Sequence, residues 1–180
     1  TQSGIAGACV IAAGVAEALS ENATVFSVAA ACLEGAREGE RIGREVSRVV
    51  PAPDMVVRTE MAIEEAIRAR DIFEAGRLIT ASVGNGLPAY EAVPAAVGLF
   101  VAAGGDPKAT VIGGANIGGD SDTIASMAGA MSGALSGLHK VPADLYKRVC
   151  EENDLNVHEL AEKLVQFQGK VEVASLETLR

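Results

Sequence analysis

The chain has 180 residues, of which 49% are hydrophobic and only 3% aromatic, and its formal net charge is −9. This length suffices for one domain with a sizeable core. The acidic balance argues against a non-specific nucleic-acid-binding protein, which needs a basic face, and no polybasic cluster is present to bind an anionic membrane. No signal peptide and no apolar stretch long enough for a membrane span is visible. We therefore expect neither a nucleic acid nor a membrane as partner.

Alanine-rich segments whose apolar residues repeat with a period of 3.6 predict an all-α protein. The expected helices cover 4–19, 24–38 with a polar extension over 40–49, 58–70, 71–79, 90–103, a short segment after Pro107, 120–138 and 156–167. The expected N-caps are Ser3, Thr24, Asp54, Asp71 and Asp106.

One stretch, 118–137, organises this expectation. Its sequence is GGDSDTIASMAGAMSGALSG, and it carries no charge from Ile124 onward. Glycines recur every four residues at Gly129, Gly133 and Gly137, a spacing that places them on one face where a neighbouring backbone can come close. We therefore predict a compact orthogonal multi-helix bundle around this small-residue helix.

Asp120, Asp122 and the hydroxyl of Thr123 form a cluster of oxygen atoms at the expected start of that helix. Hard cations such as Mg²⁺ and Mn²⁺ take such ligands. A plain helix cap is the alternative, because carboxylates are stabilised at the positive end of a helix dipole. Upstream, Gly-Asn-Gly-Leu-Pro at 84–88 is a turn by composition, and it is either a backbone cradle for a ligand or a simple connection between helices.

The three cysteines, Cys9, Cys32 and Cys150, are odd in number and lack the spacing of metal ligands. Cys9 and Cys32 lie in apolar helical stretches and are expected to be reduced core residues. This use of cysteine predicts an intracellular, cytoplasmic protein.

Three segments, in chain order, carry a resemblance that covers residues 1–145. They are TQSGIAGACVIAAGVAEAL at the start, VGNGLPAYEAVPAAVGLF from Val83, and GGDSDTIASMAGAMSGALSGLHKVP from Gly118. They resemble the mid-chain helix, the second most recognisable segment and the C-terminal signature of the ADP-ribosylglycohydrolase family, which includes the J1 crystallins. The resemblance implies metal-dependent hydrolysis of the N- or O-glycosidic bond that joins ADP-ribose to a protein side chain or a small molecule.

The resemblance also implies roles for individual residues. The family's site is binuclear, with Mg²⁺ or Mn²⁺, and Asp120, Asp122 and Thr123 match its C-terminal ligands. The two aspartates are the expected catalytic residues. The implied substrate contacts are Gln2, Asn85, Gly86, Leu87, Gly118 and Gly119. Family members often carry His at the position of Gln2, so no titrating role is expected there.

The family's other metal ligands come from a Thr-Asp-Asp motif, which this sequence lacks. One Mg²⁺ takes about six ligands, so we expect this chain alone to bind metal weakly and to hydrolyse slowly or not at all. With the start at Thr1, this predicts the C-terminal portion of a longer protein, with a missing N-terminal half as a partner. The alternative is a non-catalytic ADP-ribose-binding or structural, crystallin-like member. We expect one domain over 1–168 and a loose tail over 169–180.

Overall fold

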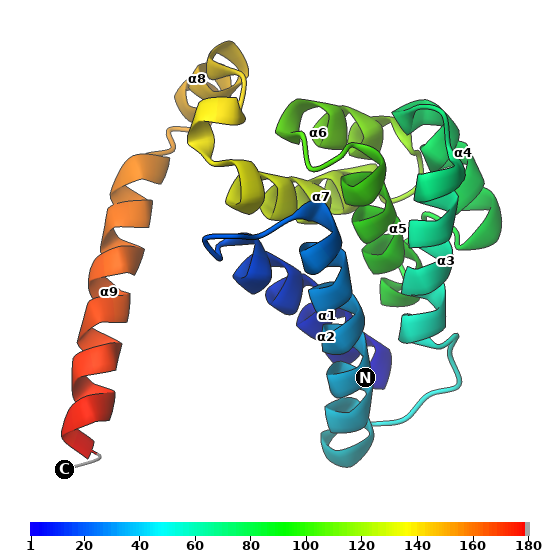
Figure 1. Cartoon of the computed structure of the whole chain (residues 1–180), viewed down its shortest axis with the longest axis horizontal. Helices are drawn as coiled ribbons and strands as arrows, with labels where there is room; N and C mark the ends of the chain where they lie inside the picture. Colours follow the sequence, from blue (N-terminus) through cyan, green and yellow to red (C-terminus); the bar gives the residue numbers. More distant parts are fainter. Residues whose placement is uncertain (179–180) are drawn as a thin grey trace. The chain divides into compact units, whose positions relative to one another are not determined.

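The computed structural model describes the backbone of residues 1–178 and the side chains of residues 1–168. Every regular element in this range is helical, which confirms the expected all-α class. The chain divides into two compact units, Thr1–Val141 and Pro142–Arg180. The first unit contains α1 (Gln2–Ala18), α2 (Val25–Val46), α3 (Met55–Arg68), α4 (Ile72–Ser82), α5 (Ala89–Ala102), α6 (Pro107–Asn116), α7 (Ser121–Ser136) and the short 3₁₀ helix η1 (Leu138–Lys140) (Figure 1).

Most helices begin where a local N-cap is available. Thr24, Asp54, Asp71 and Asp106 each accept a backbone N–H of the following turn, as expected from the sequence. The first helix differs, because it starts at Gln2 and its cap is Thr1, not Ser3. The earlier start satisfies the N–H of Gly4 with the Thr1 hydroxyl, at 3.4 Å.

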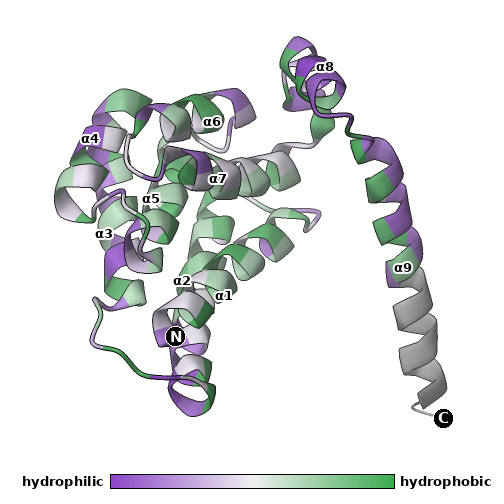
Figure 2. Ribbon diagram, turned by 180° about the vertical axis from the view of Figure 1, so that it is seen from behind, coloured by the Kyte–Doolittle hydropathy of each residue, from purple (hydrophilic) through white to green (hydrophobic). Residues whose placement is uncertain are grey.

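The helix that is buried on all sides is α5. All residues from Ala92 to Val101 are buried, and α5 packs against each of the other six α-helices of its unit. Figure 2 shows α5 largely in the hydrophobic colours. The sequence placed the small-residue helix at the centre, but α7 buries only one face, because Ser126 and Ala130 on its other side are exposed.

A close backbone contact is made by α1 and α2. Gly35, Gly39 and Gly43 lie four residues apart on α2 and face α1. A Cβ atom on Gly35 would lie 2.5 Å from the carbonyl oxygen of Cys9, and one on Gly39 would lie 2.7 Å from Cα of Ala6. The close approach expected for the glycines of α7 therefore occurs at a different glycine series.

The interior thiol of this interface is Cys32. It is fully buried, with its Sγ atom 3.7 Å from Sδ of Met131. Burial raises the pKa of the Cys32 thiol to about 12, so the thiol stays protonated and unreactive. Cys32 is therefore a core residue, as expected, whereas Cys9 is only half-buried; all three cysteines are free.

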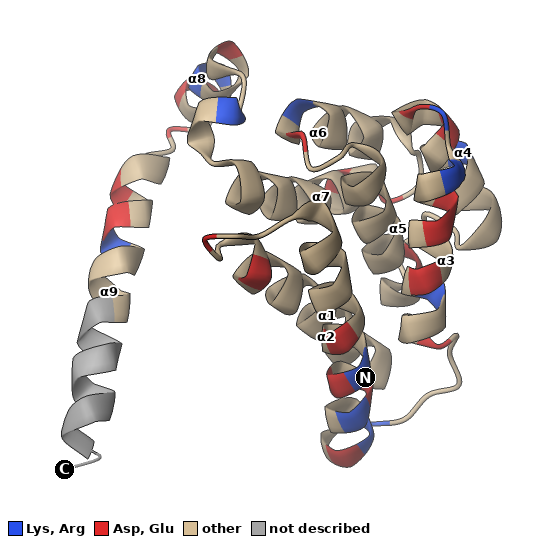
Figure 3. Cartoon of the chain, viewed as in Figure 1, with Lys and Arg blue, Asp and Glu red and all other residues tan. Residues whose placement is uncertain are grey.

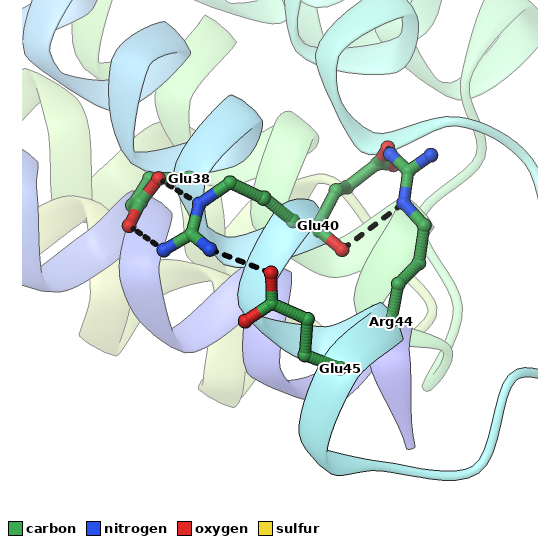
Figure 4. Close-up of polar contacts among 5 residues, drawn as sticks. Glu38, Glu40, Arg44 and Glu45 are labelled. Atoms are coloured by element: carbon green, nitrogen blue, oxygen red, sulfur yellow. Dashed lines mark hydrogen bonds and ion pairs between the residues drawn. The ribbon is translucent and has the colours of Figure 1, made fainter.

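Charged residues lie along the second half of α2 (Figure 3). Arg41 bridges Glu38 and Glu45 at 2.5 and 2.8 Å on the surface. Glu40 is different, since it is only 7% exposed. One of its carboxylate oxygens accepts from Arg44, which Figure 4 draws beside it, at 2.8 Å. The other accepts from the backbone N–H of Met55, also at 2.8 Å. Glu40 thus ties α2 to the first residue of α3.

Replacing Glu40 with alanine is expected to lower the free energy of unfolding by about 2 kcal/mol, because the buried N–H of Met55 loses its acceptor. Glu40→Gln keeps an acceptor oxygen and should retain more of the stability. Glu38→Ala removes a surface ion pair and should leave stability close to that of the wild type. Urea unfolding of the three variants measures this order, and equal losses in Glu38→Ala and Glu40→Ala would contradict it.

The second unit contains α8 (Ala143–Glu152), which the sequence did not predict, and α9 (Val157–Thr178). The side chain of Asn156 accepts the N–H of Glu159 at 3.1 Å, which places the start of α9 as expected. None of the described side chains of this unit is fully buried. The expected tail at 169–180 lies outside the residues whose side chains are described, and the single domain over 1–168 stays a prediction. In the described residues no helix combines the length and apolarity that crossing a membrane requires.

Candidate functional site

The turn between α4 and α5 and the loop between α6 and α7 are joined through Asn85. The side-chain amide of Asn85 donates to the carbonyl of Ile117 at 2.8 Å. The backbone carbonyl of Asn85 accepts the N–H of Asp120, also at 2.8 Å. Two of the segments singled out in the sequence, 84–88 and 118–123, therefore lie side by side.

Two glycines allow the second segment to approach the first. Gly118 and Gly119 have φ values of +83° and +56°, in the left-handed region that favours glycine. A Cβ atom on Gly119 would collide with the carbonyl oxygen of Asn85. Glycine at this position thus permits both the backbone turn and the contact with Asn85.

Asp120 occupies the N-cap position of α7, but its side chain makes no capping hydrogen bond. Its Oδ1 atom instead accepts from the hydroxyl of Thr123, at 3.0 Å. The carboxylates of Asp54, Asp71 and Asp106 all bind backbone N–H groups at the same position of their helices. Most of the acceptor capacity of Asp120 therefore remains free.

The oxygen donors at the start of α7 fit a hard cation in type. Asp120 is half-buried, while Asp122 and Thr123 are exposed. Both carboxylates lie at the start of α7, where the positive end of the helix dipole stabilises their negative charge. Two carboxylates and one hydroxyl are about half of the donors that one Mg²⁺ takes. Within the described residues, no cluster of three or more Asp, Glu, His or Cys side chains is placed to hold a metal.

Two charged residues that sequence reasoning did not assign to the site hold the turn at 84–88. Glu91 lies in the first turn of α5. Its Oε2 atom accepts the backbone N–H of Gly86 at 2.9 Å. Arg58 of α3 donates to the carbonyl of Val83, and its guanidinium lies 5.8 Å from the ring centroid of Tyr90. Glu91 follows Gly86 by only five residues, so its contact with the turn could have been predicted from the sequence. No sequence pattern relates Arg58 to the turn.

The remaining predicted contacts are dispersed. Leu87 is 82% exposed, at the outer side of the turn. Gln2 lies against α2 and the segment after it, where its backbone N–H donates to the carbonyl of Arg48 at 3.3 Å. A small cavity of about 140 Å³ there is also lined by Glu40. The structure thus joins Asn85, Gly118 and Gly119 directly to Asp120, whereas the described contacts of Gln2 are with α2 and the segment that follows it.

A larger cleft, of about 470 Å³, lies between α4 and α6. It is lined by Phe73, Arg77, Thr80 and Asn116 among others, and it reaches Ile117. Its lining does not include Asp120 or Asp122. The acidic cluster is therefore separate from this cleft and lies at an exposed helix start.

The fold and site define an all-α protein with an acidic oxygen cluster at the start of a helix. Residues 1–173 match the family described as ADP-ribosylglycohydrolase. The chain belongs to the ADP-ribosylglycohydrolase family. The family resemblance expected from the sequence is thereby confirmed.

Several curated proteins are similar to parts of the chain. The uncharacterized protein YegU of Escherichia coli (strain K12) is 31% identical over 118 residues, which are 66% of this chain and 35% of that protein. ADP-ribosylhydrolase ARH3 of Homo sapiens is 36% identical over 83 residues, 41% of this chain and 23% of that protein. The ARH3 protein of Bos taurus is also 36% identical, over 22% of its length. The matched part of the chain thus spans about a third or less of these relatives. No solved structure matches the chain significantly.

Proposed function

We propose that this chain contributes one half of a metal-dependent site that hydrolyses the N- or O-glycosidic bond between ADP-ribose and a protein side chain or small molecule. The observation that carries the proposal is the carboxylate of Asp120, which makes no capping hydrogen bond to its own helix. It lies at a helix N-cap position without capping the helix and beside the hydroxyl of Thr123. A carboxylate that served only as a cap would bind backbone N–H groups, as the three other aspartate caps do.

In this proposal Asp120, Asp122 and Thr123 hold Mg²⁺ or Mn²⁺. When bound, such a cation polarises an oxygen of the substrate and lowers the pKa of a bound water. The chain's own residues would orient the substrate. The backbone of Asn85 and Leu87, with that of Gly118 and Gly119, offers N–H groups near the start of α7, where an anionic pyrophosphate is favoured. The N–H of Gly86 is already donated to Glu91, so Gly86 would contribute the shape of the turn.

A protein with free cysteines and an ADP-ribosylated substrate would act inside the cell, and we propose a cytoplasmic location. The substrate would be recognised by backbone N–H groups and metal charge, because the chain itself is acidic. The linkage partner of ADP-ribose would be contacted by residues beyond those that hold the cation.

A second candidate is a non-catalytic ADP-ribose-binding or structural member of the family. The number of donors favours it, since two carboxylates and one hydroxyl can hold at most a weak single cation. The two candidates differ in the effect of Asp122→Ala in the protein at the full length of its family. A hydrolase should lose most of its release of ADP-ribose, whereas a binder should keep its affinity for ADP-ribose.

A titration of Mn²⁺ into this chain tests the cation site. We expect weak binding, with a dissociation constant on the order of 10⁻³ M, because few charged donors are present. Asp122→Asn should weaken it by about tenfold through the loss of one charge close to the ion. Asp144→Asn, in the first turn of α8, is the matched control and should have no effect. Binding that is unchanged in Asp122→Asn would remove Asp122 from the site.

A further inference from the structure

The carboxylate of Glu91 fills the inside of the turn between α4 and α5. Its Oε2 atom accepts the N–H of Gly86 at 2.9 Å. A Cβ atom on Gly86 would lie 2.9 Å from the same oxygen, and one on Gly84 would collide with it. Gly84 has a φ of +98°, so its backbone also depends on the absence of a side chain. The turn is therefore folded around this one carboxylate.

Glu91 accepts a hydrogen bond from the backbone and pairs with no positively charged side chain of the described residues. Glu91 is half-buried, and it forms no salt bridge with the described residues. The nearby guanidinium of Arg58 is instead used on the carbonyl of Val83, just before the turn. Two side chains from α3 and α5 thus hold opposite ends of the turn, one through a donor and one through an acceptor.

The turn between α4 and α5 also sets the position at which α7 begins. Asn85 lies between the two glycines that surround the Glu91 carboxylate. Its carbonyl accepts the N–H of Asp120 at 2.8 Å, and its amide donates to Ile117 at 2.8 Å. A continuous set of hydrogen bonds therefore runs from Glu91 through Gly86 and Asn85 to the backbone of Asp120.

We propose that Glu91 is a positioning residue of the candidate site, which sets the backbone of Asp120 through Gly86 and Asn85. Glu91 itself does not touch the cation or substrate. Its effect on catalysis rests on the proposed function, whereas its effect on the backbone of Asp120 does not.

Three substitutions of Glu91 separate the effect of side-chain length from that of negative charge. Glu91→Gln keeps the length of the side chain and an acceptor oxygen, Glu91→Asp keeps the charge but is one methylene shorter, and Glu91→Ala removes both. Glu64→Ala is the matched control, since Glu64 is an exposed glutamate of α3 outside this set of contacts. Glu91→Gln and Glu91→Asp keep the test available if the alanine variant does not fold.

The readout is hydrogen exchange of the amides of Gly86 and Asp120 in this chain, measured by NMR. We expect both amides to exchange about tenfold faster in Glu91→Ala and Glu91→Asp. Both should keep their protection in Glu91→Gln and in Glu64→Ala. Faster exchange at Gly86 without a change at Asp120 would overturn the proposal, because Glu91 would then hold its own turn only. Faster exchange of these amides in Glu91→Gln would also overturn the proposal. A side chain of the same length with an acceptor oxygen would then not be enough to hold the turn.

The catalytic consequence is measured separately in the full-length protein. There Glu91→Asp should lower kcat and raise KM, because the turn with the proposed substrate contacts and the aspartates move together, whereas Glu91→Gln should keep both constants close to those of the wild type. If the wild-type protein has no hydrolase activity, the proposed function fails and the exchange data still decide the role of Glu91. If the wild type is active and the exchange of Asp120 does not respond to Glu91, the function stands and the positioning role is refuted.

Discussion

Gly119→Ala is expected to disrupt the candidate site more than any other single change of one methyl group. The φ of Gly119 is +56°, where an L-residue is strained by roughly 1 kcal/mol. Its new Cβ would also collide with the carbonyl oxygen of Asn85, which holds the N–H of Asp120. To relieve the collision the two segments must separate, and the backbone of Asp120 must move. We expect the weak binding of Mn²⁺ to be lost in this chain. Under the proposed function, hydrolysis by a protein of the family's full length should fall at least about a hundredfold.

Gly104→Ala is the matched control for this experiment. Gly104 has a φ of +59°, close to that of Gly119, but a Cβ there would meet nothing within 4 Å. The control therefore carries the same backbone strain without the collision. We expect it to lower stability by roughly 1 kcal/mol and to leave Mn²⁺ binding unchanged. If both variants lose the cation equally, strain alone would explain the loss and the contact with Asn85 would not matter.

Gly35→Ala should have the largest effect on stability. Its Cβ would lie 2.5 Å from the carbonyl oxygen of Cys9 and 2.9 Å from Cβ of Ala13, so α1 and α2 would have to move apart. Overpacking against a backbone that cannot yield typically costs about 1–3 kcal/mol, and we expect about 3 kcal/mol here. Thermal unfolding followed by circular dichroism measures the loss.

Gly133→Ala is the control with the opposite expected sign. Gly133 lies in the interior of α7, and a Cβ there would meet nothing within 4 Å. Alanine is the better helix former by roughly 1 kcal/mol, so this variant should be more stable than the wild type. A destabilised Gly133→Ala variant would show that this face of α7 is packed in solution.

Several local features of this protein could be predicted from the sequence alone. Thr24, Asp54, Asp71 and Asp106 were identified as caps because capping depends on a side chain and an N–H within the next three residues. The all-α class followed from the apolar period, which also depends on nearby residues. The candidate metal ligands came from a motif of four residues, and they remain proposals.

Contacts between distant residues required the tertiary structure. The four-residue spacing of glycines indicates a face that another backbone can approach, but not what lies opposite it. The sequence therefore favoured Gly129, Gly133 and Gly137. The close contact with α1 is instead made by Gly35 and Gly39 of α2. The apolar residues of α5 surround the helix, a pattern typical of a buried helix, but the helices that cover it could be assigned only from the structure.

The candidate site shows the same division. By itself the sequence determined the turn at 84–88 and the acidic start of α7, because both are written in adjacent residues. Only the tertiary structure decided that Asn85 binds Asp120, that Asp120 leaves its carboxylate out of the helix cap, and that Glu91 supports the turn from within. These contacts depend on how α4, α5, α6 and α7 pack, and packing is set by the fit of whole helix surfaces, which no local pattern of residues specifies.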